Sequence, residues 1–201
     1  VAGDALAAME AHRQTVYTEA IAAYTRADAK YKHPAIKMNL GGLLVLTGRG
    51  EDGIKPLTEA TNHPQMAAGA YHGIGQAYFT AKKQRQATRF LLQCLQLVDT
   101  QLAIDEDEQQ MLNSIYRRLG SMFEKVTEES IQAINQRLVD MLQGKDWKVR
   151  LTDTRRQLEE ILREQGERGV IDFLTAPEGD RLAQSIAIID RYVRRGLFTL
   201  A

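Results

Sequence analysis

The sequence is poor in residues that interrupt helices or cross-link the chain. Only 4 of its 201 residues are proline, and aromatic residues make up 6%. The single cysteine, Cys94, excludes an intrachain disulfide and any metal site that needs several cysteines. No apolar run approaches the roughly 20 residues that a membrane-spanning helix requires. Because runs of β-branched residues are also almost missing, the composition favours an all-α chain without a membrane segment.

An excess of charge of one sign is missing as well. The chain has 26 Lys and Arg against 26 Asp and Glu, for a formal net charge of +0. This balance argues against a strongly basic nucleic-acid-binding protein, and it would not oppose association of the chain with another copy. We therefore expect no nucleic acid and, because long apolar runs are missing, no membrane as a partner, and a homo-oligomer is compatible with the charge. No signal-peptide pattern opens the sequence, which favours a cytoplasmic location.

One fixed interval recurs in the first half of the chain. The pair Leu40-Gly41 returns as Ile74-Gly75. The number of residues from Leu40 to Ile74 is called the repeat interval below. The apolar positions within each unit follow the spacing of one helix face. Each unit therefore predicts two helices joined by a turn, whose apolar face is buried only when neighbouring units stack. The repeat interval also links Leu44 with Tyr78, Gly53 with Ala87, Leu57 with Leu91, and Ala60 with Cys94.

This pattern resembles the tetratricopeptide repeat (TPR), whose unit has the same length as the repeat interval. The clearest match is Tyr71-x2-Ile74-Gly75-x2-Tyr78, followed by Ala87-x3-Leu91. The resemblance implies an all-α, right-handed α-solenoid of antiparallel helix hairpins. It implies about four units over residues 1–143, with an insertion near 101–112, and extra helices over 144–201 that cap the solenoid. The fourth unit is indicated by Tyr116-x2-Leu119-Gly120-x2-Phe123.

The ends of the predicted helices follow from a few residues. Residues 4–13 are predicted as the first helix of the first unit, and 17–27 as its second helix. Pro34 and Pro64 lie at unit boundaries, and Pro56 is expected near a helix start, where a missing N–H costs least.

Four further predictions concern the second half of the chain. The acidic segment 105–108 is expected to be a solvated linker before the next helix. Gly166 is expected to end a helix. A short helix over 170–174 and a last amphipathic helix over about 178–195 would follow.

The sequence lacks the residue spacings that are typical of catalytic sites and of metal or phosphate binding. No HxxxH, HxxE or CxxC occurs, and the glycine-rich segment 48–56 lacks the G-x4-G-K-[ST] spacing of a phosphate loop, so it predicts a turn. His33 and His63 each precede a proline and are expected in turns. Cys94 occupies a small-residue packing position and is expected to be buried and unreactive. We therefore expect a non-enzyme without cofactor or metal.

The resemblance also implies where a partner would bind. In this family the first helices of the units line a concave groove, and Asn39 matches a typical groove asparagine. An alternative is that the apolar members of the set simply pack between helices. The groove residues implied in this way are Met9, His12, Arg13, Met38, Asn39, Val45, His72, Gln76, Phe79, Arg117, Arg118 and Ser121.

Two functional hypotheses follow from the sequence. The first is a non-catalytic protein–protein interaction scaffold that binds a peptide or helix of a partner in its concave groove. The second is a regulatory or self-assembly segment of a larger protein, which packs on an effector domain or on another copy.

Overall fold

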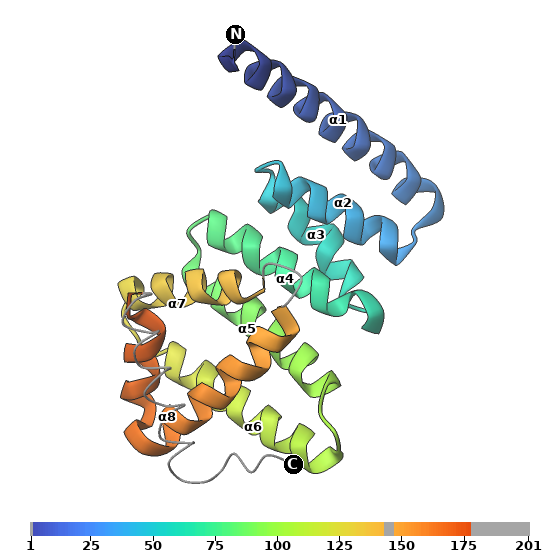
Figure 1. The fold of residues 1–201 in the computed structure, drawn as a ribbon. Coiled ribbons are helices and arrows are strands. Elements are labelled where there is room, and N and C mark those ends of the chain that lie inside the picture. The colour runs from blue at the N-terminus through green and yellow to red at the C-terminus, as the bar shows by residue number, and fades with distance from the viewer. Residues whose placement is uncertain (1, 143–146, 178–201) are drawn as a thin grey trace, which may run out of the picture. The chain divides into compact units, whose positions relative to one another are not determined.

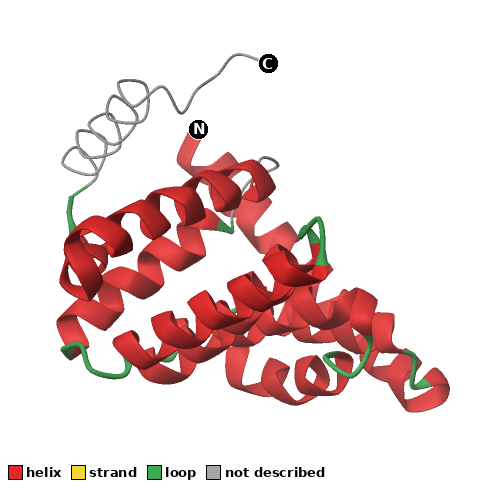
Figure 2. Cartoon of the chain, turned by 90° about the horizontal axis from the view of Figure 1, so that it is seen from below, coloured by secondary structure: helices red, strands yellow, loops and turns green. Residues whose placement is uncertain are grey.

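The computed structural model describes residues 2–142 and 147–177. Over these residues the chain forms eight α-helices and no strand, which confirms the all-α prediction (Figure 1; Figure 2). The last predicted helix, over 178–195, lies outside the described residues. No helix in the described part is both long and apolar enough to cross a lipid bilayer. The helices are α1 (Ala2–Tyr31), α2 (Pro34–Leu46), α3 (Gly50–Ala60), α4 (Pro64–Thr80), α5 (Gln84–Gln101), α6 (Glu106–Phe123), α7 (Glu128–Met141) and α8 (Trp147–Thr175).

The chain divides into two units, Val1–Tyr116 and Arg117–Ala201. In the first unit each of the helices α1 to α4 packs on the next one along the chain, and α2 also packs on α4. The boundary between the units lies inside α6, whereas the sequence placed the end of the repeats at residue 143. The extent of the repeats therefore stays a prediction.

The predicted hairpin at the amino terminus is wrong, because α1 is one helix of 30 residues. The segment Gln14–Val16, where the turn was expected, contains neither glycine nor proline, so nothing in it ends the helix. Residues 4–16 are all exposed. The half-buried residues of α1 begin at Tyr17 and follow the face predicted for the second helix: Tyr17, Ala20, Ile21, Tyr24, Ala27 and Asp28.

Two glycines separated by the repeat interval allow two pairs of helices to approach closely. A Cβ added to Gly41 on α2 would overlap the side chain of Leu57 on α3. A Cβ added to Gly75 on α4 would lie 2.8 Å from Cγ of Leu91 on α5. Within the described part of the chain, Gly120, the corresponding glycine of the predicted fourth unit, has no such neighbour within 4 Å. Gly120 therefore matches the repeat in sequence but does not make the close contact that Gly41 and Gly75 make.

The turns after α2 and α4 are also separated by the repeat interval. Gly48 has φ +79°, and Lys82, at the equivalent position of the next unit, has φ +58°. The N–H of Arg49 donates to the carbonyl of Leu44 at 2.8 Å, and the N–H of Lys83 donates to that of Tyr78 at 2.9 Å. α2 and α4 therefore end in the same kind of turn, which contains one residue with positive φ and is closed by this hydrogen bond.

Replacing Lys82 by Gly is expected to raise the free energy of unfolding by about 0.5–1 kcal/mol, because glycine adopts a positive φ without the steric cost of a side chain. The reciprocal change, Gly48→Lys, is expected to lower it by a similar amount. Urea unfolding followed by circular dichroism measures both changes. A stability of Lys82→Gly at or below that of the wild type would contradict the prediction.

Two local predictions need correction. Pro56 lies in the interior of α3, because that helix already begins at Gly50. The acidic residues Glu106–Glu108 form the first turn of α6 and are not a linker. Asp105 precedes that turn, and its Oδ1 accepts a hydrogen bond from the N–H of Glu108 at 2.8 Å. Acidic side chains are favoured at this end of a helix, which explains why the helix extends through them.

The second unit contains α7 packed on α8. Thr127 caps α7, because its hydroxyl accepts a hydrogen bond from the N–H of Ser130 at 3.2 Å. Gly166 interrupts α8 with φ +70° and ψ −164°, in agreement with the predicted helix end. The helix that follows Gly166 buries Phe173 and Leu174 and ends at Thr175, close to the predicted short helix.

Candidate functional site

The predicted groove residues of the first unit lie on three helices. Met9, His12 and Arg13 are in the exposed half of α1. Met9 is 70% exposed, and an Nη of Arg13 forms an ion pair with a carboxylate oxygen of Glu10 at 2.6 Å. These three residues therefore lie on a free helix surface.

The predicted groove residues on α2 have two different roles. Met38 and Val45 are partly buried against the apolar cluster of Leu57, Ala60, Ala70 and Ile74. This contact supports the alternative that both pack between helices. Asn39 is exposed, and its Nδ2 donates to the Tyr24 hydroxyl on α1 at 3.2 Å. The amide oxygen of Asn39 has no hydrogen-bond partner among the described residues, so it can accept a hydrogen bond from a ligand.

The predicted groove residues on α4 are half-buried and share one face of the helix. His72, Gln76 and Phe79 follow the spacing i, i+4, i+7. Because α2 packs on α4, they belong to the same packed group of helices as Asn39. The Nε2 atom of His72 is enclosed and makes no hydrogen bond within the described part of the chain. Burial therefore lowers the pKa of His72.

The lowered pKa of His72 predicts a loss of stability in mild acid. Below the unfolded-state pKa of about 6.5, the unfolded chain binds a proton that the folded chain does not yet bind. Stability therefore falls as the pH decreases through this value, until the folded-state pKa is reached. The His72→Phe variant is expected to show a shallower loss of unfolding free energy between pH 7 and pH 5. Urea unfolding at several pH values measures this slope, and an unchanged slope would contradict the prediction.

The last three predicted groove residues belong to the second unit. Arg117, Arg118 and Ser121 are exposed on α6. Nε of Arg118 lies 3.4 Å from Oε1 of Glu167 on α8, and the Ser121 hydroxyl donates to the Arg117 carbonyl at 3.1 Å. Because the first unit ends at Tyr116, the structure does not join these residues to the set on α2 and α4.

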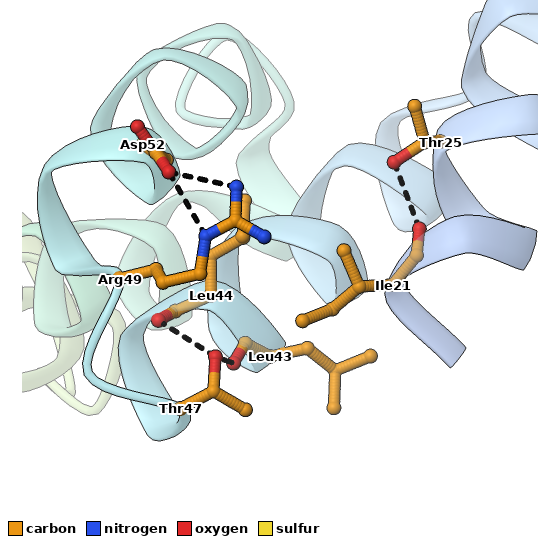
Figure 3. Close-up of polar contacts among 7 residues, drawn as sticks. All are labelled: Ile21, Thr25, Leu43, Leu44, Thr47, Arg49 and Asp52. Carbon is orange, nitrogen blue, oxygen red and sulfur yellow. Dashed lines mark hydrogen bonds and ion pairs between the residues drawn. The ribbon is translucent and has the colours of Figure 1, made fainter. Parts of the chain in front are cut away.

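A hollow that sequence reasoning missed lies between α1, α2 and α3. Its volume is about 260 Å³. Leu44 on α2 lies beside Arg49 and Asp52 at the start of α3, and Ile21 and Thr25 come from α1 (Figure 3). Nε and Nη2 of Arg49 both donate to Oδ2 of Asp52, at 3.0 and 2.8 Å. The lining residues are Ile21, Thr25, Asp28, Lys37, Leu40, Leu44, Arg49, Asp52, Lys55, Pro56 and Glu59.

One lysine in this hollow connects all three helices. Nζ of Lys37 on α2 lies 3.1 Å from Asp28 on α1 and 2.5 Å from Glu59 on α3. Hydrogen bonds to Glu59 and Asp28 raise the pKa of Lys37. The ion pairs of Lys37 with Asp28 and Glu59 therefore link α1, α2 and α3 at this hollow. No spacing in the sequence indicated this triad, because its members lie on separate helices.

A second hollow, of about 330 Å³, lies between α2, α3 and α4. Among the predicted groove residues, Val45 alone lines it. The other lining residues are Gly48, Arg49, Gly50, Glu51, Asp52, Ala77, Thr80 and Ala81. Because most of these residues form the turn after α2 and the start of α3, this hollow follows from the repeated turn.

Cys94 is buried on α5, as the sequence predicted. Burial raises the pKa of its thiol to about 12, although a hydrogen bond with the backbone of His72 opposes the shift. At neutral pH the side chain is therefore an uncharged thiol, which is a poor nucleophile. No group of three or more His, Cys, Asp or Glu residues able to hold a metal ion is found in residues 2–142 and 147–177.

Comparison of the chain with protein-family models, with curated proteins and with solved structures found no match.

Proposed function

We propose that the protein is a non-catalytic interaction scaffold, built as a TPR-like, right-handed α-solenoid, which binds a peptide or helix of a partner protein. The observation that carries this proposal is the recurrence of one packing contact and one turn at the repeat interval. Gly41 meets Leu57 and Gly75 meets Leu91, and Gly48 and Lys82 share a left-handed conformation. Stacked units of this kind present the same face of successive helices to a ligand.

The face proposed to bind the ligand is formed by α2 and α4. Asn39 is exposed, and Gln76 and Phe79 are half-buried. Side-chain amides can donate to and accept from an extended peptide backbone, and an aromatic ring supplies apolar contact area. The ligand would therefore be a partially apolar peptide segment or one face of a helix. Arg117, Arg118 and Ser121 remain predicted contacts of the second unit.

The proposal is tested by site-specific photocrosslinking followed by binding measurements. A photoreactive residue at position 76 is expected to capture a protein in an extract of the native source, and one at the exposed Arg89 of α5 serves as the matched control. The captured protein is then purified and titrated against Phe79→Ala, Asn39→Ala and Arg89→Ala.

Phe79→Ala is expected to weaken binding by about tenfold, as for an aromatic contact residue at an interface, and Arg89→Ala to leave it unchanged. Thermal unfolding of each variant separates lost binding from lost folding. Equal binding by Phe79→Ala, Asn39→Ala and the wild type, or capture only from position 89, would overturn the proposal.

The proposal includes a protein partner rather than nucleic acid or a membrane, no cofactor or metal, and a cytoplasmic location. The alternative is that the chain is a regulatory or self-assembly segment of a larger protein, which packs on an effector domain or on another copy. One observation favours self-assembly, namely the exposed apolar side chains of α1.

A further inference from the structure

The hollow between α1, α2 and α3 has a counterpart one repeat interval further along the chain. Three residues of α2 and α3 that line the hollow are Lys37, Leu44 and Pro56. The repeat interval links these positions, in the same order, with three aromatic residues: Tyr71, Tyr78 and Phe90. The hollow therefore lies where the next unit of the repeat carries aromatic rings.

These aromatic rings pack together where α3, α4 and α5 meet. The ring centroids of Tyr78 and Phe90 are 5.5 Å apart and the rings are stacked, and the centroids of Tyr71 and Phe90 are 6.3 Å apart. Tyr78 and Phe90 also pack on the buried cluster that includes Leu57 of α3. Around the hollow, the equivalent positions carry no aromatic ring. The hollow is therefore the space that aromatic side chains fill in the next unit.

The size and the lining of the hollow suit an aromatic ring. Its volume is about 260 Å³, whereas an apolar cavity of about 150 Å³ holds benzene. Leu40 and Leu44 of α2 are buried in its wall. Ile21 of α1 and Pro56 of α3 add further apolar surface. A ring that enters the hollow would exchange water for contact with apolar side chains from all three helices.

The charges that line the hollow leave one cation without a partner. The lining carboxylates are all paired with lining cations: Asp28 and Glu59 with Lys37, and Asp52 with Arg49. Lys55 is exposed on α3 and makes no ion pair or hydrogen bond within the described part of the chain. A negative charge on the ligand would therefore be complementary to Lys55.

We propose that this hollow binds an aromatic side chain of a partner protein that has an acidic residue next to it in sequence. The ring lies between Leu44 and Pro56, and the acidic side chain pairs with Lys55. None of the residues proposed for the face on α2 and α4 lines this hollow. The inference therefore goes beyond the proposed function and does not depend on it.

Titration with short peptides tests the site directly in the full chain. The probe is acetyl-Gly-Phe-Glu-Gly-amide, and nuclear magnetic resonance follows the methyl groups of Ile21 and Leu44. Their signals are expected to shift and to saturate. Ala in place of Phe is expected to weaken binding by about tenfold, and Lys in place of Glu by about threefold. No saturable shift at these methyl groups, or equal binding of all three peptides, would overturn the proposal.

A variant that fills the hollow provides the second measurement. Leu44→Tyr/Pro56→Phe introduces the aromatic residues of the next unit and is expected to abolish the shift at Ile21. The control Leu46→Tyr adds the same ring at a position that is 64% exposed and does not line the hollow, and it is expected to bind as the wild type does. Circular dichroism checks that each variant folds. Undiminished binding by the folded double variant would overturn the proposal.

Charge reversal tests the same site without changing its packing. Lys55→Glu is expected to weaken binding of the Phe-Glu peptide by about fivefold and to strengthen binding of the Phe-Lys peptide. Arg89→Glu is the matched control, because Arg89 lies one repeat interval after Lys55 and is also exposed. Equal effects of the two reversals would overturn the proposal. All these variants leave the face on α2 and α4 with its Asn39, Gln76 and Phe79, so failure here leaves the proposed function standing.

Discussion

Replacing Leu57 by Ala is expected to lower the free energy of unfolding by about 3–5 kcal/mol. Leu57 is fully buried on α3, at 0% exposure. It contacts Gly41 on α2, and a Cβ added to Gly73 on α4 would lie 2.9 Å from its Cδ1. Truncation would therefore open a cavity where three helices meet, and the glycines, which have no side chains, cannot fill it.

The matched control is Leu46→Ala, because Leu46 on α2 is 64% exposed. This variant is expected to lose at most about 0.5 kcal/mol, as for most surface substitutions. Urea unfolding followed by circular dichroism measures both values. Equal losses in the two variants would contradict the placement of Leu57 at the centre of the first unit.

The second large effect on the free energy of unfolding is expected at the adjacent glycines Gly41 and Gly42, where substitution by alanine changes stability in opposite directions. Gly41→Ala is expected to lower the free energy of unfolding by about 1–3 kcal/mol, because the new methyl group would overlap Leu57. Gly42→Ala is expected to raise it by up to about 1 kcal/mol, because no atom of another described element lies within 4 Å of its Cβ position and alanine favours helix over glycine.

A double-mutant cycle shows whether Gly41 and Leu57 share this contact. In Gly41→Ala/Leu57→Ala the new methyl group at position 41 enters space that Leu57 has vacated. The combined loss is therefore expected to be smaller than the sum of the two single losses by about 1 kcal/mol or more. Additive losses, or destabilisation by Gly42→Ala as large as by Gly41→Ala, would contradict the close approach of α2 and α3.

The contacts of α2 to α5 could be predicted because they connect residues that are near in sequence. Gly41 and Leu57 lie on consecutive helices, and so do Gly75 and Leu91. The repeat interval therefore indicated both which residues are buried and where small residues are needed. The family pattern also matched at Gly120, which has no close neighbour among the residues that the structure describes. A matching spacing does not determine which helix face meets a neighbour.

The candidate site could be predicted only in part. The resemblance to the tetratricopeptide repeat implied Asn39, Gln76 and Phe79 as groove residues, and they are exposed or half-buried on packed helices. It did not separate them from Met38 and Val45, which pack on the apolar core. The two classes have the same periodicity, and their exposure depends on the angle at which α2 and α4 cross.

The sequence by itself determined the all-α class, the repeat interval, and the burial of Leu57, Leu91 and Cys94, because helix propensity and periodic burial are local properties. Only the tertiary structure decided that α1 is a single helix and that Lys37 joins Asp28 to Glu59. The repeat pattern predicted a turn at residues 14–16, whereas the structure shows that the helix continues through them, as the lack of glycine and proline there allows. Likewise, which charges pair across three helices depends on how those helices meet in space.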